Sequence, residues 1–115
     1  MPRKSLEYLD SESIPWTRIH EGVYERVLSR DPDTNAYTRL VRFDAGSRMD
    51  DILVHDFFEE FVVVDGSLTD HTLNKTFTRG AYAFRAPGLK HGPFSSPNGC
   101  LAIEIRYFGH TPKAP

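Results

Sequence analysis

The chain of 115 residues has little of several features that would indicate particular classes of protein. It has one cysteine, Cys100, which excludes an intramolecular disulfide framework and predicts a reducing, cytoplasmic location. No stretch approaches the ~18 apolar residues of a membrane-spanning helix. The N-terminus also lacks the apolar run of a signal peptide. We therefore expect no membrane association.

Basic charge is also scarce, with 14 Lys and Arg against 16 Asp and Glu and a formal net charge of -2. Nucleic-acid binding requires a basic footprint, so we expect no nucleic-acid partner. The glycines occur singly at predicted turns, which argues against a phosphate-binding loop. The sequence contains neither a G-x-S-x-G elbow nor a C-x-x-C pair.

A helical period is missing as well, since no window of 11 or more residues carries one. Short apolar segments instead alternate with Gly, Pro and Asn at intervals of about ten residues, a pattern typical of all-β sandwiches and barrels. We predict one domain over residues 16–108, preceded by an arm (1–15) and followed by a tail (109–115). The arm is expected to pack along a sheet edge or to cross to a second subunit.

The expected strands follow from local patterns. Residues 22–28 and 36–43 form a hairpin around a Pro, Asp and Asn turn. Residues 61–64 form a strand buried on both faces, and Asp65-Gly66 makes a hairpin turn. Tyr82 and Phe84 are expected in the core.

The last strand is predicted over residues 100–108, with an apolar set facing the core: Leu101, Ile103, Ile105 and Tyr107. Its other face then turns Glu104 and Arg106 toward solvent or a subunit interface. Arg42 and Arg85 are also assigned to the surface by default.

Residues 46–66 carry the candidate site. His55 and Glu59 lie on either side of a turn, so their side chains can converge on one point. His91 follows a second turn at Pro87-Gly88 and can reach the same cavity. Two histidines and a carboxylate are a ligand set used by non-haem iron and by catalytic zinc.

These two stretches resemble the two motifs of the cupins. Gly46, His55, Glu59 and Gly66 fit the first motif, G-x5-H-x-H-x3-E-x6-G, with one extra residue after the first glycine. Gly80, Pro87 and His91 fit the second motif, G-x5-P-x-G-x2-H, with a one-residue expansion. The resemblance implies a cupin fold, a double-stranded β-helix or jelly-roll-like barrel of two antiparallel sheets. The sequences of residues 59–68 and 91–94 are similar to those of the cupin branch that holds acetylacetone dioxygenase and the anti-sigma-factor cupin domains.

The chain departs from the cupin pattern at one ligand. Leu53 occupies the position of the first histidine, which leaves His55, Glu59 and His91 as candidate ligands for one divalent ion: Fe, Zn, Mn or Ni. Period-two geometry places Asp51 on the same face as His55, so Asp51 is a candidate replacement. The opposite interpretation is a pocket that has lost its metal.

Three functions remain open at this point. The first is a small-molecule metalloenzyme, by resemblance dioxygenase-like, acting on a dicarbonyl or small organic acid, with Glu59 and His91 as catalytic residues. The second is a metal-independent isomerase or lyase in which Glu59 and a histidine act as acid and base. The third is a non-enzymatic ligand-binding or sensor domain. It is ranked last because anti-sigma cupins normally accompany a zinc-binding helical domain, for which this sequence shows no segment and only one cysteine. A homodimer is expected in each case.

Overall fold

The structure is a computed structural model, and it describes residues 3–109. Its elements in chain order are η1 (Ser11–Ser13), β1 (Thr17–His20), β2 (Val23–Arg30), β3 (Tyr37–Phe43), β4 (Ser47–Met49), β5 (Phe58–Asp70), β6 (Lys75–Thr78), β7 (Tyr82–Arg85), β8 (Phe94–Ser96) and β9 (Cys100–Tyr107). The predicted all-β class is therefore confirmed. Within the described residues no helix is long and apolar enough to cross a membrane.

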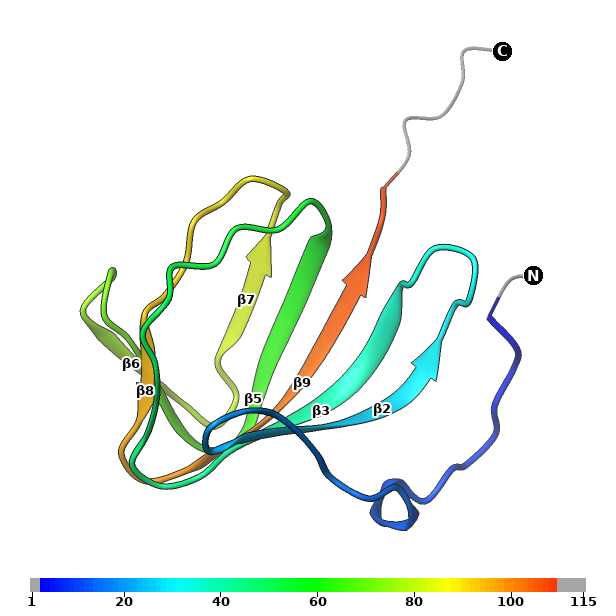
Figure 1. The fold of residues 1–115 in the computed structure, drawn as a ribbon, viewed down its shortest axis with the longest axis horizontal. Coiled ribbons are helices and arrows are strands. Elements are labelled where there is room, and N and C mark those ends of the chain that lie inside the picture. Colours follow the sequence, from blue (N-terminus) through cyan, green and yellow to red (C-terminus); the bar gives the residue numbers. More distant parts are fainter. Residues whose placement is uncertain (1–2, 110–115) are drawn as a thin grey trace.

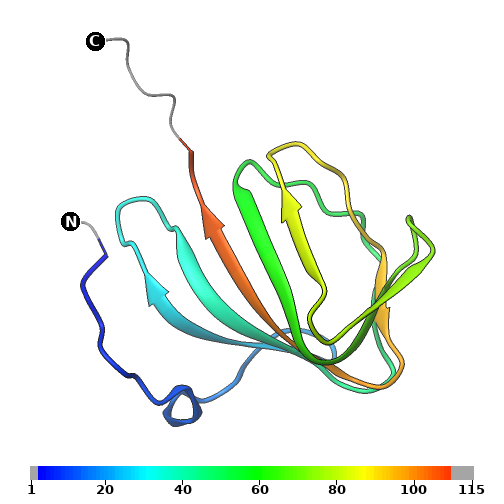
Figure 2. The ribbon, with the colours of Figure 1, turned by 180° about the vertical axis from the view of Figure 1, so that it is seen from behind.

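The strands form a nearly closed antiparallel barrel (Figure 1). Hydrogen bonding runs in the order β1-β2-β3-β9-β5-β8-β4, and β6 and β7 also pair with β5. The first half of β5 lies between β9 and β7, while its second half pairs with β6 and β8. β5 therefore belongs to two sheets, one with β1, β2, β3, β7 and β9 and the other with β4, β6 and β8, and Figure 2 shows it crossing between them.

The predicted hairpin turn at Asp65-Gly66 is wrong, because β5 continues through it. Gly66 has φ +77°, and a Cβ there would lie 2.1 Å from the carbonyl oxygen of Gly99. The register between β5 and β9 also shifts between Val63 and Asp65. Glycine is needed here because the strand bends and meets another backbone, as at a β-bulge.

The core fills the interior of the barrel. Its buried members are Val23, Val41, Phe43, Phe61, Val63, Leu68, Phe94, Cys100 and Ala102. The prediction that residues 61–64 are buried on both faces is wrong, because Val64 is 37% exposed on the outer face. The sheet thus has one face on the core and one outside, as is common for antiparallel sheets.

The last strand and β7 face the opposite way from the prediction. Ala102 and Glu104 are buried, whereas Ile103 and Ile105 lie outside and are only partly buried. Tyr82 and Phe84 are 58% and 50% exposed rather than in the core. In both strands the larger apolar side chains were expected to face the core, whereas they lie on the outer face, so both errors have the same origin.

The first described residues lie outside the barrel. Residues 3–10 of the predicted arm are all exposed, and they run beside the sheet rather than within it (Figure 1). Arg26 holds the arm's end by donating from Nε to the carbonyl of Ile14 at 2.6 Å. Of the predicted tail, all but Gly109 lies outside the described residues.

Candidate metal site

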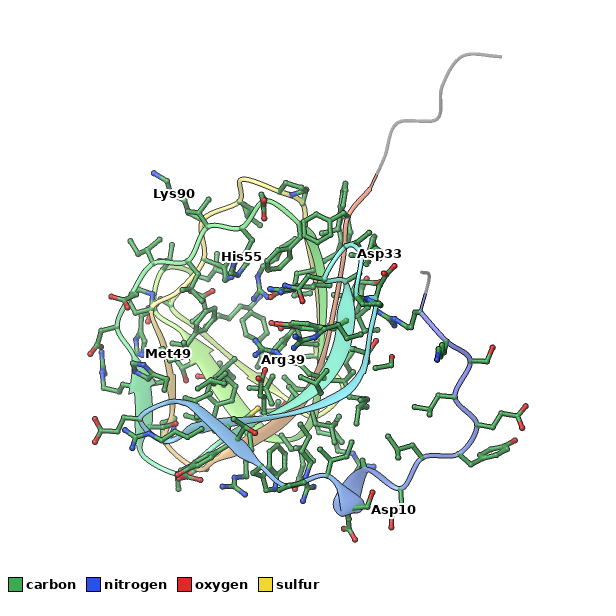
Figure 3. The ribbon with its side chains drawn as sticks, turned by 45° about the vertical axis from the view of Figure 1, so that its right-hand side comes forward. Asp10, Asp33, Arg39, Met49, His55 and Lys90 are labelled. Carbon is green, nitrogen blue, oxygen red and sulfur yellow. The ribbon has the colours of Figure 1, made fainter. Side chains whose placement is uncertain are left out.

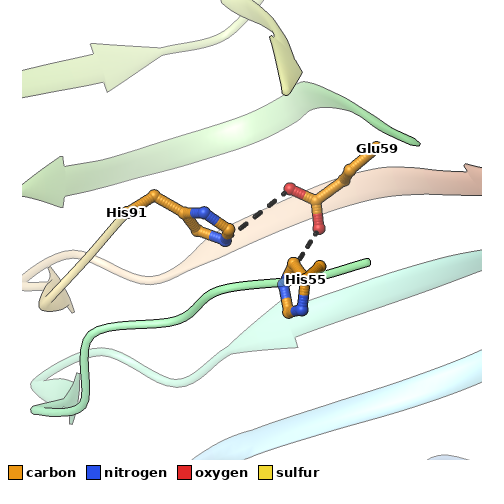
Figure 4. A group of neighbouring side chains, drawn as sticks. All are labelled: His55, Glu59 and His91. Carbon is orange, nitrogen blue, oxygen red and sulfur yellow. Dashed lines mark ion pairs between the residues drawn. The ribbon is translucent and has the colours of Figure 1, made fainter. Parts of the chain in front are cut away.

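Three potential ligands converge inside the barrel. His55 lies in the loop that precedes β5, Glu59 is the second residue of β5, and His91 lies in the loop between β7 and β8. Their ligand atoms all lie within 4.8 Å of one another, and Figure 4 shows both imidazoles turned toward the Glu59 carboxylate. The structure thus brings together the three side chains that the sequence singled out.

Backbone pairing between the two loops sets this geometry. Leu53 and His91 exchange both N–H···O bonds, at 2.7 and 3.0 Å, as an isolated antiparallel bridge. The Gly88 N–H donates to the carbonyl of His55 at 2.9 Å. These bonds hold the His55 and His91 rings with their centroids 4.9 Å apart.

The distances are close to those of a site for a single ion. Two ligands that each lie ~2.1 Å from one ion are about 3.0 to 3.6 Å apart when their bonds to it make angles of about 90 to 120°. Glu59 meets His55 Nε2 at 3.9 Å through Oε2 and His91 Nε2 at 4.0 Å through Oε1. Shifts of under about 2 Å would bring these separations and the widest one, 4.8 Å, into that range.

The local environment keeps both histidines in the form that binds metals. Burial lowers the pKa of His55, and the charge of His91 lowers it further. Burial also lowers the pKa of His91, with Arg85 acting in the same direction. His91 Nδ1 lies 3.3 Å from the carbonyl of Leu89. Donation from Nδ1 leaves Nε2 as the ligand atom facing Glu59.

Buried charges surround this group, and the sequence-based assignments missed them. Arg85 Nη1 donates to Glu59 Oε1 at 2.6 Å. Arg39 bridges two glutamates, donating from Nε to Glu104 and from Nη1 to Glu25, both at 2.6 Å. The predictions that Arg85 and Glu104 lie on the surface are wrong, since their side chains are only 14% and 9% exposed.

One signal in the sequence could have revealed this network. Arg39 alternates with Tyr37, Val41 and Phe43, so a charge lies on the apolar face of β3. A charge on a buried face requires a partner from a neighbouring strand. β9 pairs Glu104 directly opposite Arg39.

Glu104 can hold a proton beside Glu59. Burial raises the pKa of Glu104 to about 7, and a hydrogen bond to Glu59 raises it as well, against the opposing charge of Arg39. Near neutral pH the protonated carboxyl of Glu104 can therefore donate to the Glu59 carboxylate. Arg39 donates to Glu104 and Arg85 to Glu59, so each carboxyl group has its own arginine.

The other candidates lie apart from this group. Asp51 is exposed and does not join the three ligands. Leu53, in contrast, lines the cavity of about 90 Å³ that contains them. His71 is exposed, as predicted, with Nε2 2.7 Å from Ser95 Oγ. Glu60 accepts from the Tyr82 hydroxyl on the outer face. His110 lies outside the described residues.

A nearly closed antiparallel barrel whose interior gathers two histidines and a glutamate defines the chain as a cupin. The sequence model of the ChrR cupin-like domain matches residues 4–106. The chain therefore belongs to the ChrR cupin-like domain family. No curated protein sequence matches it.

Solved structures agree on the fold. An RmlC-like cupin from Shewanella frigidimarina has 21% identity and a TM-score of 0.75, covering 92% of this chain and 93% of its own. An acetylacetone dioxygenase from Acinetobacter johnsonii has 20% identity and a TM-score of 0.71, covering 92% and 76%. The anti-sigma ChrR, in complex with Rhodobacter sphaeroides SigE, has 21% identity and a TM-score of 0.66, covering 82% and 50%.

Proposed function

We propose that the barrel of residues 16–108 is a metal-dependent enzyme acting on a small molecule. The observation that carries this proposal is the convergence of His55, Glu59 and His91 within 4.8 Å. A divalent ion bound there would supply Lewis acidity and a point of attachment for a substrate oxygen. The likeness in fold to acetylacetone dioxygenases supports a dicarbonyl or small organic acid as the substrate and a dioxygenase-like reaction.

The surrounding residues suit this role. Arg85 fixes the orientation of the Glu59 carboxylate, and Glu104 supplies a proton beside it. The network contains three glutamates and two arginines, namely Glu25, Glu59, Glu104, Arg39 and Arg85. With Glu104 protonated the other four charges balance, and loss of its proton leaves one excess negative charge, which favours a cation between the neutral imidazoles.

Metal analysis tests the proposal. Protein purified without a histidine tag or chelator is expected to hold about one Fe, Zn, Mn or Ni per chain, measured by inductively coupled plasma mass spectrometry. Glu59→Gln and His91→Ala are expected to lower this content at least tenfold, because each removes one of three ligands. His71→Ala, which removes an exposed imidazole, should keep it. Absence of metal even after reconstitution with all four ions would overturn the proposal.

The Glu59–Glu104 pair favours a second candidate, metal-independent acid–base catalysis. Two carboxyl groups that share a proton, each held by an arginine, can protonate and deprotonate a substrate carbon next to a carbonyl. For this candidate we expect turnover of a substrate to survive exhaustive chelation and to be lost in Glu59→Gln. Loss of turnover on chelation would exclude it.

We also propose that the protein is a cytoplasmic homodimer that associates through the outer face of the sheet. An apolar row crosses four strands on this face: Tyr82, Val62, Ile103 and Leu40 lie side by side in register. The outer face of an antiparallel sheet is more often polar. Glu60 on β5 and Arg42 on β3 lie on opposite sides of the row, so a two-fold axis would bring unlike charges together.

Val62→Lys is expected to convert the dimer to a monomer, because it places one charge per chain at the centre of the interface. Sedimentation equilibrium or light scattering gives the mass directly. Thr78→Lys, on an exposed position of β6, is the matched control and should leave the dimer intact. A monomeric mass for the unchanged chain would contradict the proposed interface.

A further inference from the structure

A second cavity of about 320 Å³ lies beside the candidate metal site. β6 and β7 pair with different halves of β5, so their edges diverge in the barrel wall (Figure 2). The cavity occupies this divergence and extends under the loop that carries His91. We call it the side pocket. Its volume is at the lower end of the range of roughly 300–1,000 Å³ for small-molecule sites.

The side pocket is mostly apolar. Its hydrophobic lining consists mainly of Phe61, Val63, Leu68, Phe77, Ala81, Ala83 and Phe94. Ala83 and Phe61 are paired in register and share the inner face, so the small alanine leaves room in front of the aromatic ring. Such a lining favours the hydrocarbon part of a ligand.

Charge in the side pocket is mainly positive. Arg85 and Lys90 contribute cationic side chains, and Figure 3 shows Lys90 at the outer edge of the molecule. The one carboxylate in the lining belongs to Asp70, whose Oδ1 already accepts the backbone N–H groups of Thr72 and Leu73. Two cationic side chains and one carboxylate give the lining one excess positive charge, which favours an anion, and because Arg85 shares its charge with Glu59, Lys90 contributes most of this preference.

The side pocket adjoins the metal-site cavity directly. The two cavities share five lining residues: Phe61, Leu68, Arg85, His91 and Phe94. Arg85 donates to Glu59 at 2.6 Å, and its guanidinium carbon lies 5.7 and 5.8 Å from the ring centroids of Phe61 and Phe94. A ligand head at Arg85 therefore lies next to two of the candidate metal ligands, Glu59 and His91.

We propose that the side pocket binds the hydrocarbon chain of an organic anion whose carboxylate or enolate head lies at Arg85, beside the candidate metal ligand His91. Such an anion would be the substrate of the metal site proposed above. Its reaction rests on that proposal, whereas its binding to the side pocket does not. Ligands with a chain of several carbons should bind, whereas short polar acids should bind weakly.

The test uses straight-chain alkanoates as probes. Acetate, butanoate, hexanoate and octanoate are titrated into the metal-free and the Zn²⁺-loaded protein, with dissociation constants from amide chemical shifts. We expect affinity to rise roughly threefold to fourfold for each added CH₂ until the pocket is full. The amides that shift should include those of β7 and of residues 89–94.

Two substitutions change the pocket in opposite directions. Ala83→Phe fills it and should abolish the gain in affinity beyond butanoate, while Phe77→Ala enlarges it and should extend the gain to longer chains. Ala45→Phe, in an exposed turn away from the pocket, is the matched control. Because Phe77→Ala removes volume without introducing a clash, it tests the inference even if Ala83→Phe does not fold.

The outcomes separate this inference from the metal proposal. A protein that holds no metal but binds alkanoates with the expected chain-length dependence overturns the metal site and supports the side pocket. Affinity that is independent of chain length, or unchanged by both pocket substitutions, overturns the side pocket whatever the metal content.

Discussion

Leu53→His is expected to bind Zn²⁺ at least about tenfold more tightly than the unchanged chain, since changes in outer-shell partners alone shift metal affinity by roughly that factor or more. Leu53 and His91 form a directly opposed antiparallel pair, so their side chains share one face. Cβ atoms of such pairs lie ~5 Å apart. Leu53 also lines the cavity that contains the three candidate ligands. An imidazole at position 53 would supply the fourth ligand.

Competition with a chromophoric chelator measures this gain. Ile52→His is the matched control, because Ile52 precedes Leu53 and is 59% exposed. A histidine there adds the same group without reaching the cavity, so its Zn²⁺ affinity should match that of the unchanged chain. Equal affinity of Leu53→His and Ile52→His would show that position 53 does not face the ion.

Gly66→Ala is expected to lower the free energy of unfolding by more than about 3 kcal/mol, or to prevent folding. Two effects add at this position. The backbone has φ +77°, which L residues rarely adopt, and the new Cβ would lie 2.1 Å from the carbonyl oxygen of Gly99. The backbones at Gly66 and Gly99 cannot move apart without breaking the pairing of β5 with β9.

Urea denaturation followed by circular dichroism gives the loss, and Gly80→Ala separates its two causes. Gly80 has φ +90°, but a Cβ added there would have nothing within 4 Å of it. Its substitution should therefore cost only the conformational term, about 1 kcal/mol. Similar losses at Gly66 and Gly80 would mean that the contact with Gly99 is relieved at little cost.

The sequence was sufficient to predict the class of fold and the convergence of the site. Turn residues located the hairpin of β2 and β3, and the spacing of His55, Glu59 and His91 indicated three groups that meet. These features depend on local patterns and on short intervals along the chain. Such patterns are visible in one sequence.

The faces of the strands and the buried charges could not be predicted in the same way. In β9, apolar residues alternate with Cys100, Ala102 and Glu104, and the larger apolar set faces outward. Hydrophobicity alone therefore selects the wrong face. The partner of Arg39 is 65 residues away, so its burial follows from the pairing of β3 with β9 and not from a local pattern.

β5 is a structural member of both sheets, and this has a consequence for how the barrel unfolds. A strand that pairs with β9 and β7 at one end and with β6 and β8 at the other couples the opening of one sheet to that of its neighbour. Because Glu59 lies near the start of this strand, an ion held there would slow hydrogen exchange in both sheets together. Ligand binding at one end of the barrel would then reduce local opening of the backbone throughout the barrel.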